Sequence, residues 1–298
     1  MRFSFWPSPA QPFTEVVDLC EHVEKTGWDG VWYADHFMPN AEDTSSPMTE
    51  AWTTLAALAS RIDRIRFGTL VTGNTYRHPA VLAKMAATID HISGGRVVLG
   101  LGSGWQENEH SQYGIPFYTV GERLERLDEA CAVIKTLFSE PVSNFDGRFY
   151  QLKEASLEPK PVQRPLPLMI GGGGEKVTLK IAAKYADEWN VWGTVETLKH
   201  KMAILDDHCA NVGRDPSTIQ RSAVALLFMS DDAAFIDKMK SRNLGQAAII
   251  GSPAEVKEIV QAYEAIGVDE LIVPDFTLGA REQKLATLDT FISEVAGR

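Results

Sequence analysis

Basic side chains are in deficit in this chain, with 29 Lys and Arg against 40 Asp and Glu and a formal net charge of −11. That deficit argues against a surface for nucleic acid or for an anionic membrane, where a basic face is expected. No apolar run approaches the ~20 residues that cross a bilayer, and residues 1 to 20 have neither the basic start nor the apolar core of a secretion signal. We therefore expect a cytoplasmic protein whose partners are small molecules, not nucleic acid or membrane.

Cysteine is also rare, and the histidines do not form a metal-binding pattern. The three cysteines, Cys20, Cys131 and Cys209, contain no C-x-x-C pair and each falls in a predicted helix, so we interpret them as reduced core residues. The seven histidines show neither H-x-H nor H-E-x-x-H spacing, which predicts no metal site. The Lys-Ser/Thr of a P-loop is missing too, although backbone amides at a helix start can still bind a phosphate.

The stretch from Ser93 to Asn108 contains a helix end, a buried strand and a polar strand exit. Ser93-Gly94-Gly95 ends the preceding helix, and the apolar run 96–101 is typical of a parallel strand covered on both faces. Gly102-Ser103-Gly104 then lets the backbone approach a ligand closely. A cluster of polar and aromatic residues follows at 105–110, and this strand end is predicted to belong to a site.

The same alternation of strand and helix runs through the whole chain. Apolar runs predict eight strands at 2–6, 30–34, 66–71, 96–101, 168–170, 188–192, 221–228 and 270–273. Helical periodicity and start signals, including Thr119-x-x-Glu122 and Ser252-x-x-Glu255, predict helices after Pro12, at 51–60, after Pro79, from 119, at 175–185, at 195–211, at 231–242, from 252 and at 280–296. Residues 38–49 are a long loop, and Phe145 to Tyr150 is a hairpin around Asp-Gly.

Eight strands that are each followed by a helix predict one (β/α)8 TIM barrel domain over 1–298, with insertions near 103–118, 143–166 and 229–251. A doubly wound open sheet is the alternative. The barrel is favoured because ligand-type residues follow strands one to six in turn, whereas an open sheet concentrates them at a switch point.

Three features at the strand ends suggest chemistry, and each has a simpler interpretation. Gly171 to Gly174 before Glu175 forms a nest of amides suited to phosphate, or only a flexible turn. His36 is a candidate general acid or base, or a packing and capping histidine; Asp35 beside it reads as structural. Most aromatics near strands are core residues, but Trp6, Trp105 and Trp192 lie at carboxyl ends where they can wall a planar ring.

Taken together and in order, the motifs resemble those of the luciferase-like flavin and deazaflavin oxidoreductases over nearly the whole chain. The residues that carry the resemblance are Gly30-Val-Trp-Tyr-Ala-Asp-His-Phe37, His78-Pro-Ala-Val81, Asp90-His-Ile-Ser-Gly-Gly-Arg96, Gly100-Leu-Gly-Ser-Gly-Trp105 with Asn108, and Gly171-Gly-Gly-Gly-Glu175 followed by Ala186-Asp-Glu-Trp-Asn190. Asp-His-Phe after strand two is most similar to members that use the deazaflavin coenzyme F420.

The resemblance implies a homodimer of luciferase-like barrels, each with a cofactor across its carboxyl face and a non-prolyl cis peptide near Leu70-Val71 behind the cofactor ring. It implies His36 as the residue that exchanges a proton, and a substrate pocket of Trp6, Phe37, Trp105 and Trp192. The cofactor-binding residues expected on this basis are Asp35, His36, Leu70, Val71, Thr72, Gly102, Ser103, Gly104, Trp105, Asn108, Gly171, Gly172, Gly173, Gly174 and Glu175.

The function expected from this resemblance is hydride transfer between coenzyme F420 and a small organic substrate. In the family's sugar-phosphate dehydrogenases an acidic residue stands at the position of Trp105, so Trp105 favours a more apolar or aromatic substrate. Two alternatives stay open. One is an FMN-dependent monooxygenase on the same barrel, and the other is a protein that binds a flavin or deazaflavin without turnover.

Overall fold

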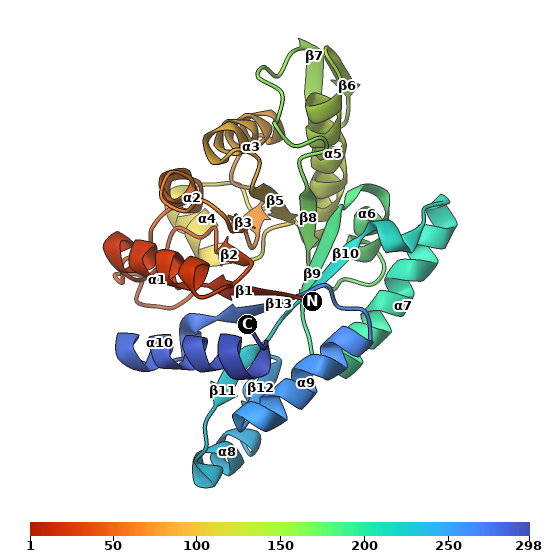
Figure 1. Cartoon of the computed structure of the whole chain (residues 1–298). Helices are drawn as coiled ribbons and strands as arrows, with labels where there is room; N and C mark the ends of the chain where they lie inside the picture. Colours follow the sequence, from red (N-terminus) through yellow and green to blue (C-terminus); the bar gives the residue numbers. More distant parts are fainter.

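The computed structural model describes all residues from 1 to 298, and its centre is a closed barrel of parallel strands (Figure 1). The ring closes because β3 pairs with β2 on one side and with β5 on the other, which confirms the barrel and excludes the open sheet. In order around the ring, the eight strands are β1 (Arg2–Trp6), β2 (Gly30–Tyr33), β3 (Arg66–Thr69), β5 (Val97–Gly102), β8 (Leu168–Gly171), β9 (Glu188–Trp192), β10 (Gln220–Val224) and β13 (Glu270–Pro274).

Helices surround the barrel and cover the outer faces of its strands (Figure 1). The capping boxes predicted at Thr119 and Ser252 both form, with side-chain and backbone hydrogen bonds in each direction. The helices are α1 (Phe13–Lys25), α2 (Ala51–Ala59), α3 (Pro79–Ser93), α4 (Glu107–Tyr113), α5 (Val120–Ser139), α6 (Thr178–Tyr185), α7 (Val195–Val212), α8 (Ala233–Lys240), α9 (Pro253–Ala265) and α10 (Arg281–Thr290). Short 3-10 turns η1 (Pro216–Thr218) and η2 (Asp275–Thr277) and a π-helical turn η3 (Phe291–Val295) complete the set.

The inside of the barrel has two layers of different chemistry. Towards the carboxyl ends, a separate apolar cluster includes Trp6, Trp32 and Met169. At the opposite end lies a layer of charge in which the fully buried Glu270 accepts hydrogen bonds from Ser4 Oγ at 2.5 Å and Trp32 Nε1 at 2.8 Å. The barrel is therefore filled at its amino end, and its carboxyl end is the face at which ligands bind in folds of this kind.

Strand three is shorter than its apolar pattern predicts. The strand predicted at 66–71 ends at Thr69, and after the peptide between Leu70 and Val71 the chain resumes as β4 (Thr72–Gly73), which pairs with β5. That peptide bond is cis, as the family resemblance implies.

Strand seven is divided, which the prediction of one strand at 221–228 missed. β10 ends at Val224, and β11 (Leu226–Met229) leaves the barrel to pair with β12 (Ala248–Gly251), a strand that the sequence analysis did not predict. A continuous apolar run hides such a division, because both parts are buried against the same core.

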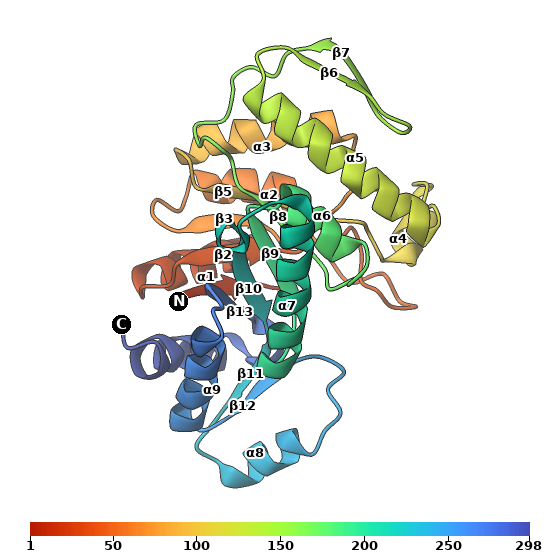
Figure 2. The ribbon, with the colours of Figure 1, turned by 90° about the vertical axis from the view of Figure 1, so that its right-hand side faces the viewer.

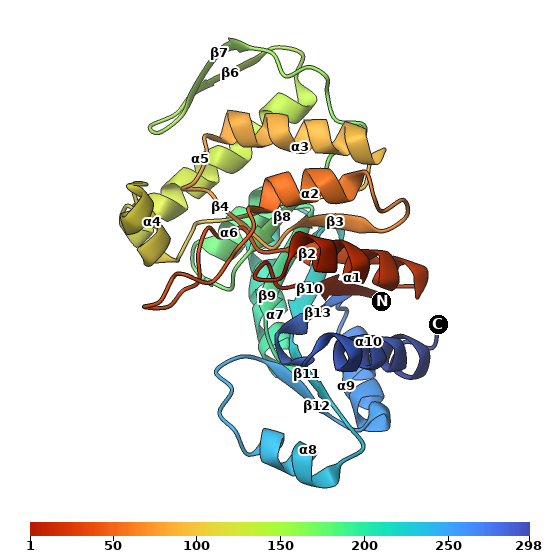
Figure 3. The same cartoon turned by 90° about the vertical axis from the view of Figure 1, so that its left-hand side faces the viewer.

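The expected insertions carry their own elements. The hairpin forms from β6 (Ser143–Asp146) and β7 (Gln151–Ala155) and lies over α5 at one end of the molecule, while β11, β12 and α8 lie at the other end (Figure 2). The segment near 103–118 contains α4, which lies beside the long loop that follows β2 (Figure 3).

Burial corrects one prediction about the helices and confirms another. The helical spacing of Val81, Leu82, Met85, Ile89 and Ile92 predicts one apolar face for α3. Val81 and Ile92 are instead 54% and 49% exposed, because α3 turns its Leu82, Ala86 and Ile89 side inward. The three cysteines are free and buried, as expected. No helix of the structure has the length and apolar character needed to span a membrane.

Candidate functional site

His36 and Glu109 come from different strand ends and meet at the carboxyl face. His36 follows β2, and Glu109 lies in the first turn of α4, which follows β5. The Nδ1 atom of His36 is 2.9 Å from Glu109 Oε1, and the Phe37 amide donates to Glu109 Oε2 at 2.8 Å. His36 Nε2 makes no hydrogen bond within the protein, and the imidazole is partly exposed. The pair therefore has the arrangement of a histidine acid or base oriented by a carboxylate.

The carboxylate of Glu109 is ionised although it is completely buried. Burial alone raises the pKa of a carboxyl group, but hydrogen bonds from His36, the Phe37 amide and the Tyr76 hydroxyl outweigh that effect and hold the pKa of Glu109 below its usual range. Burial and the Glu109 charge raise the pKa of Tyr76, so its hydroxyl stays a donor. Glu109 belongs to the polar cluster predicted at 105–110, but its pairing with His36 and the role of Tyr76 were not predicted.

Asp35 and Phe37, on either side of His36, are committed to contacts within the protein. The Asp35 side chain is fully buried and accepts two hydrogen bonds from Arg77, at 2.7 and 3.2 Å. Phe37 packs against the rings of Tyr76 and Tyr113. Asp35 thus fixes the end of β2, as its structural interpretation predicts, and Phe37 fixes the loop against α4.

The chain after β3 enters the barrel mouth at Val71, and glycines on the neighbouring strands make room for it. A Cβ atom on Gly102 or on Gly171 would lie 2.8 Å from a methyl group of Val71, closer than side chains pack. Gly100 likewise faces the Thr69 carbonyl. These glycines let Leu70 and Val71 occupy the place that the resemblance assigns to the support behind a cofactor ring.

Thr72 and Asn108, both predicted to bind the cofactor, have hydrogen-bond partners within the protein. Thr72 is buried, accepts from Trp52 Nε1 at 2.8 Å and donates to Thr69 Oγ1 at 3.2 Å. Asn108 donates its amide to the Pro39 carbonyl at 2.8 Å. Ser103 makes no side-chain hydrogen bond, and Gly104 adopts a positive φ of 81°. Ser103 and Gly104 therefore remain the accessible part of this strand exit.

The glycine segment after β8 is an open loop and not the first turn of a helix. The predicted helix start at Glu175 is wrong, because α6 begins at Thr178. The Gly172 amide donates to the Asn190 carbonyl at 2.9 Å, whereas the amides of residues 173–177 have no acceptor in the protein. Lys201 of α7 pairs with the Glu175 carboxylate at 2.5 Å and lowers its pKa. The loop thus offers several free N–H groups in succession, and the ion pair between Lys201 and Glu175 holds it against α7.

Aromatic side chains stand on two sides of the face. Trp105 is 60% exposed, and its ring meets the His36 ring edge-on with centroids 5.4 Å apart. The ring centroid of Trp6 lies 5.9 Å from that of Trp192 and 5.2 Å from that of Phe276. Phe276 is 51% exposed and was not predicted as a site residue. Trp6 and Trp192, each predicted as a possible wall for a planar ring, thus lie together on one side, and Phe276 extends that side.

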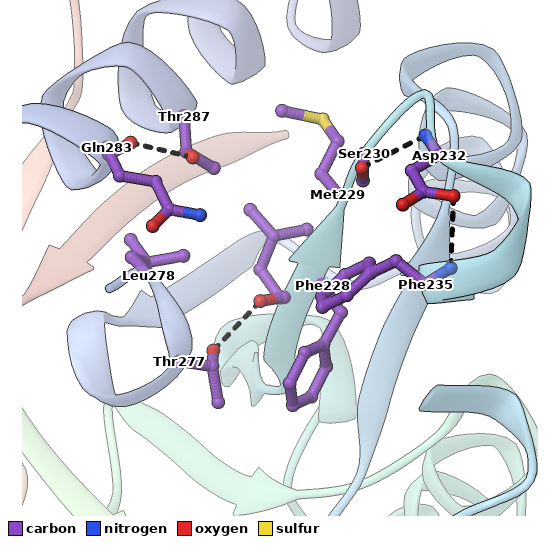
Figure 4. Close-up of a pocket in the computed structure, with 10 residues that line it drawn as sticks. Phe228, Met229, Ser230, Asp232, Phe235, Thr277, Leu278, Gln283 and Thr287 are labelled. Carbon is purple, nitrogen blue, oxygen red and sulfur yellow. Dashed lines mark hydrogen bonds between the residues drawn. The ribbon is translucent and has the colours of Figure 1, made fainter. Parts of the chain in front are cut away.

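Two cavities lie near these elements, and only one borders a residue of the predicted site. A hollow of about 570 Å³ at the end of β9 is lined by Trp192, Thr194, Thr197 and residues 242–250. A smaller cavity of about 180 Å³ lies beside β11, where residues of β11, α8, η2 and α10 come together (Figure 4). Its one acidic group, Asp232, caps α8 through the Ala234 and Phe235 amides. The second cavity is therefore separate from the His36 site.

Fold and site together define a (β/α)8 barrel protein with a histidine–carboxylate pair, a loop of free amides and aromatic walls on its carboxyl face. The model of the luciferase-like monooxygenase family matches residues 1–239. The chain belongs to this family.

Known proteins similar to this chain include enzymes of two kinds. A curated relative, the F420-dependent glucose-6-phosphate dehydrogenase of Amycolatopsis mediterranei, is 37% identical over 174 residues, 58% of this chain and 50% of that protein. The chain thus spans about half the length of the curated relatives that it matches. The F420-dependent tetrahydromethanopterin reductase of Methanopyrus kandleri has a TM-score of 0.82 at 18% identity over 99% of this chain and 98% of its own. A long-chain alkane monooxygenase reaches 0.83 at 16% identity, over 100% of this chain and 90% of its own.

Proposed function

We propose that this protein is an oxidoreductase that transfers a hydride between coenzyme F420 and a small organic substrate. The observation that carries the proposal is the buried Glu109 carboxylate holding Nδ1 of His36, with Nε2 of the same ring free at the barrel mouth. Relatives that are named F420-dependent dehydrogenases support the choice of cofactor. His36 would take a proton from a substrate hydroxyl, or return it to a carbonyl oxygen, through Nε2.

The residues at the carboxyl face fit a phosphorylated, planar cofactor. The amides of residues 173–177 have no acceptor in the protein, which suits a phosphate group despite the acidic net charge. Leu70 and Val71 at the bulge would support one face of a ring, and Ser103 and Gly104 would border it. When bound, the deazaflavin supplies the carbon that accepts or gives the hydride, and the protein supplies position and the proton.

The substrate we propose is apolar or aromatic in its main part. Trp105 stands beside His36, and Trp6, Trp192 and Phe276 form the second wall. A sugar phosphate requires polar groups where Trp105 is exposed, so the activity named for the curated relatives is not the one we assign. A cytoplasmic homodimer stays a prediction.

The alternatives differ in what they require. An FMN-dependent monooxygenase uses the same barrel, and a monooxygenase is among the similar structures. A protein that binds the cofactor without turnover would not need an ionised, buried carboxylate behind a free imidazole nitrogen, and the cost of burying that charge argues against it.

The proposal is tested by mixing the protein with oxidised F420 and a panel of alcohols, and following the loss of deazaflavin absorbance. In the reaction the alcohol carbon loses a hydride to F420 and the hydroxyl loses a proton, so the alcohol becomes a carbonyl compound. We expect reduction of F420 with apolar or aromatic alcohols and none with glucose 6-phosphate. No reduction by any alcohol, and no reoxidation of reduced F420 by the matching carbonyl compounds, would overturn the proposal.

A further inference from the structure

We infer that Glu109 is a positioning residue that fixes His36 in the tautomer with its hydrogen on Nδ1 and so presents Nε2 as the atom that exchanges a proton. The consequence for catalysis rests on the proposed function. The tautomer itself does not, because the geometry around Glu109 sets it in the protein alone.

The contacts of Glu109 leave only one arrangement of hydrogens. Both carboxylate oxygens accept, Oε1 from His36 and Tyr76 and Oε2 from the Phe37 amide at 2.8 Å. An ionised carboxylate has no hydrogen to give, so the hydrogen in the 2.9 Å contact belongs to His36 Nδ1. In the neutral imidazole, Nε2 then carries the lone pair.

An acidic residue in the first turn of a helix usually acts on the helix dipole, and Glu107 fills that role in α4. Glu107 is exposed and makes no side-chain hydrogen bond. Glu109, two residues further, is turned inward and reaches the end of β2 and the segment after β4. Its partners lie 33 to 73 positions away in the chain, so its role is to join elements at the face.

The other ionisable groups around the His36–Glu109 pair have hydrogen-bond partners elsewhere. Asp35 pairs with Arg77 behind the end of β2. His110 bonds through both ring nitrogens, to the Gln106 carbonyl at 2.6 Å and to Thr75 Oγ1 at 2.7 Å, and it stacks on Tyr76. None of these groups competes with Glu109 for the Nδ1 atom of His36, although the Tyr76 hydroxyl lies 3.5 Å from it.

The tautomer is tested directly by nitrogen-15 NMR of the histidine-labelled protein, without cofactor or substrate. The His36 signals are assigned by comparison with His36→Gln. We expect the Nδ1–H form in the natural protein and in Glu107→Gln, which is the matched control. In Glu109→Gln the amide oxygen accepts from the Phe37 amide and the NH2 group donates to Nδ1, so we expect almost only the Nε2–H form. An Nε2–H form in the natural protein, or an unchanged Nδ1–H form in Glu109→Gln, would overturn the inference.

Kinetics of the same variants then connect the tautomer to the proposed function. Glu109→Gln should lower kcat by roughly 10²-fold or more, with KM and cofactor affinity changed by a few fold, because a histidine in the wrong tautomer cannot exchange the proton. If F420 turnover is absent in every protein, only the NMR result decides the inference, and the proposed function fails separately. Equal kcat in Glu107→Gln and Glu109→Gln with a changed tautomer would contradict a role in proton exchange.

Discussion

At the level of single residues, His36 is the group on which the proposed chemistry depends. His36→Ala removes the free Nε2 atom but leaves Leu70, Val71 and the loop at 173–177 intact. We expect kcat to fall by ~10² to 10⁴, the usual range for a positioned acid or base, with F420 affinity within a few fold. The acidic limb of the kcat profile should disappear. Loss of stability or of cofactor binding, with the pH profile of the remaining turnover unchanged, would mean that His36 is only a packing residue.

The second prediction at this scale concerns the free amides after β8. Gly173→Asp places a carboxylate among the amides of residues 173–177 and should abolish cofactor binding, because the two anions repel each other. Gly173→Asn is the matched control, since it has the same shape without the charge. In both variants the added Cβ atom would lie 3.0 Å from a methyl group of Val191, so any effect of that contact is the same in each. Equal affinities for F420 in the two variants, measured by titration, would place the phosphate elsewhere.

The strand-end residues could be found from the sequence, but their partners could not. His36 and the glycine loop follow apolar runs directly, and the ends of parallel strands meet on one face by the geometry of the fold. The pairing of His36 with Glu109 depends on the direction in which α4 leaves β5, and α4 has too little apolar periodicity in its seven residues to be predicted. Phe276 lies in a turn after β13 and was missed because no motif marks it.

At the level of elements, α4 holds the loop after β2 in place. Gln106 donates to the Met38 carbonyl at 2.8 Å, and Asn108 donates to the Pro39 carbonyl at 2.8 Å. Gln106→Ala should leave the Met38 carbonyl without its partner and raise hydrogen exchange of the 36–44 segment by roughly fivefold, about 1 kcal/mol of local stability. Ser111→Ala is the control, because the Ser111 hydroxyl bonds only within α4. An equal exchange rate in both variants would show that α4 does not fasten this loop.

The division of the predicted strand 221–228 shows what an apolar run leaves open. Each residue from Ala223 to Leu227 is apolar, but only β10 stays in the barrel, while β11 pairs with β12. A period-free apolar pattern predicts burial but not which neighbour a strand chooses. The same holds at Thr69, where β3 ends although the apolar pattern continues.

At the level of the whole molecule, the charged layer at the amino end of the barrel joins strands from both halves of the chain. Burial raises the pKa of Glu270, but Arg66 and Arg2 outweigh it, and its net pKa is lowered. A lowered pKa means that this carboxylate stabilises the fold above the ordinary glutamate pKa of about 4.3, and that the stabilisation is lost as the pH falls through the lower value of the folded protein. Glu270 is therefore a source of acid sensitivity far from the site.

Glu270→Gln should destabilise the protein by about 3 to 5 kcal/mol near neutral pH, because Arg2 and Arg66 lose a buried counter-charge. Its stability should also fall less steeply in acid than that of the natural protein. Denaturant unfolding at several pH values measures both effects, with Glu258→Gln on the exposed side of α9 as the control. A loss of unfolding free energy as small as that of the control would show that the charged layer contributes little to stability.

The central claim is that the carboxyl face of this barrel is built for a deazaflavin, and equilibrium titration of the purified protein with oxidised F420 and with FMN tests it most directly. Fluorescence quenching reports binding of both cofactors to the same preparation. We expect F420 to bind more tightly than FMN, and we expect Gly173→Asp to lose this binding while Gly173→Asn keeps most of it. No binding of F420 would contradict the claim, and tighter binding of FMN would contradict it and favour a flavin-dependent monooxygenase.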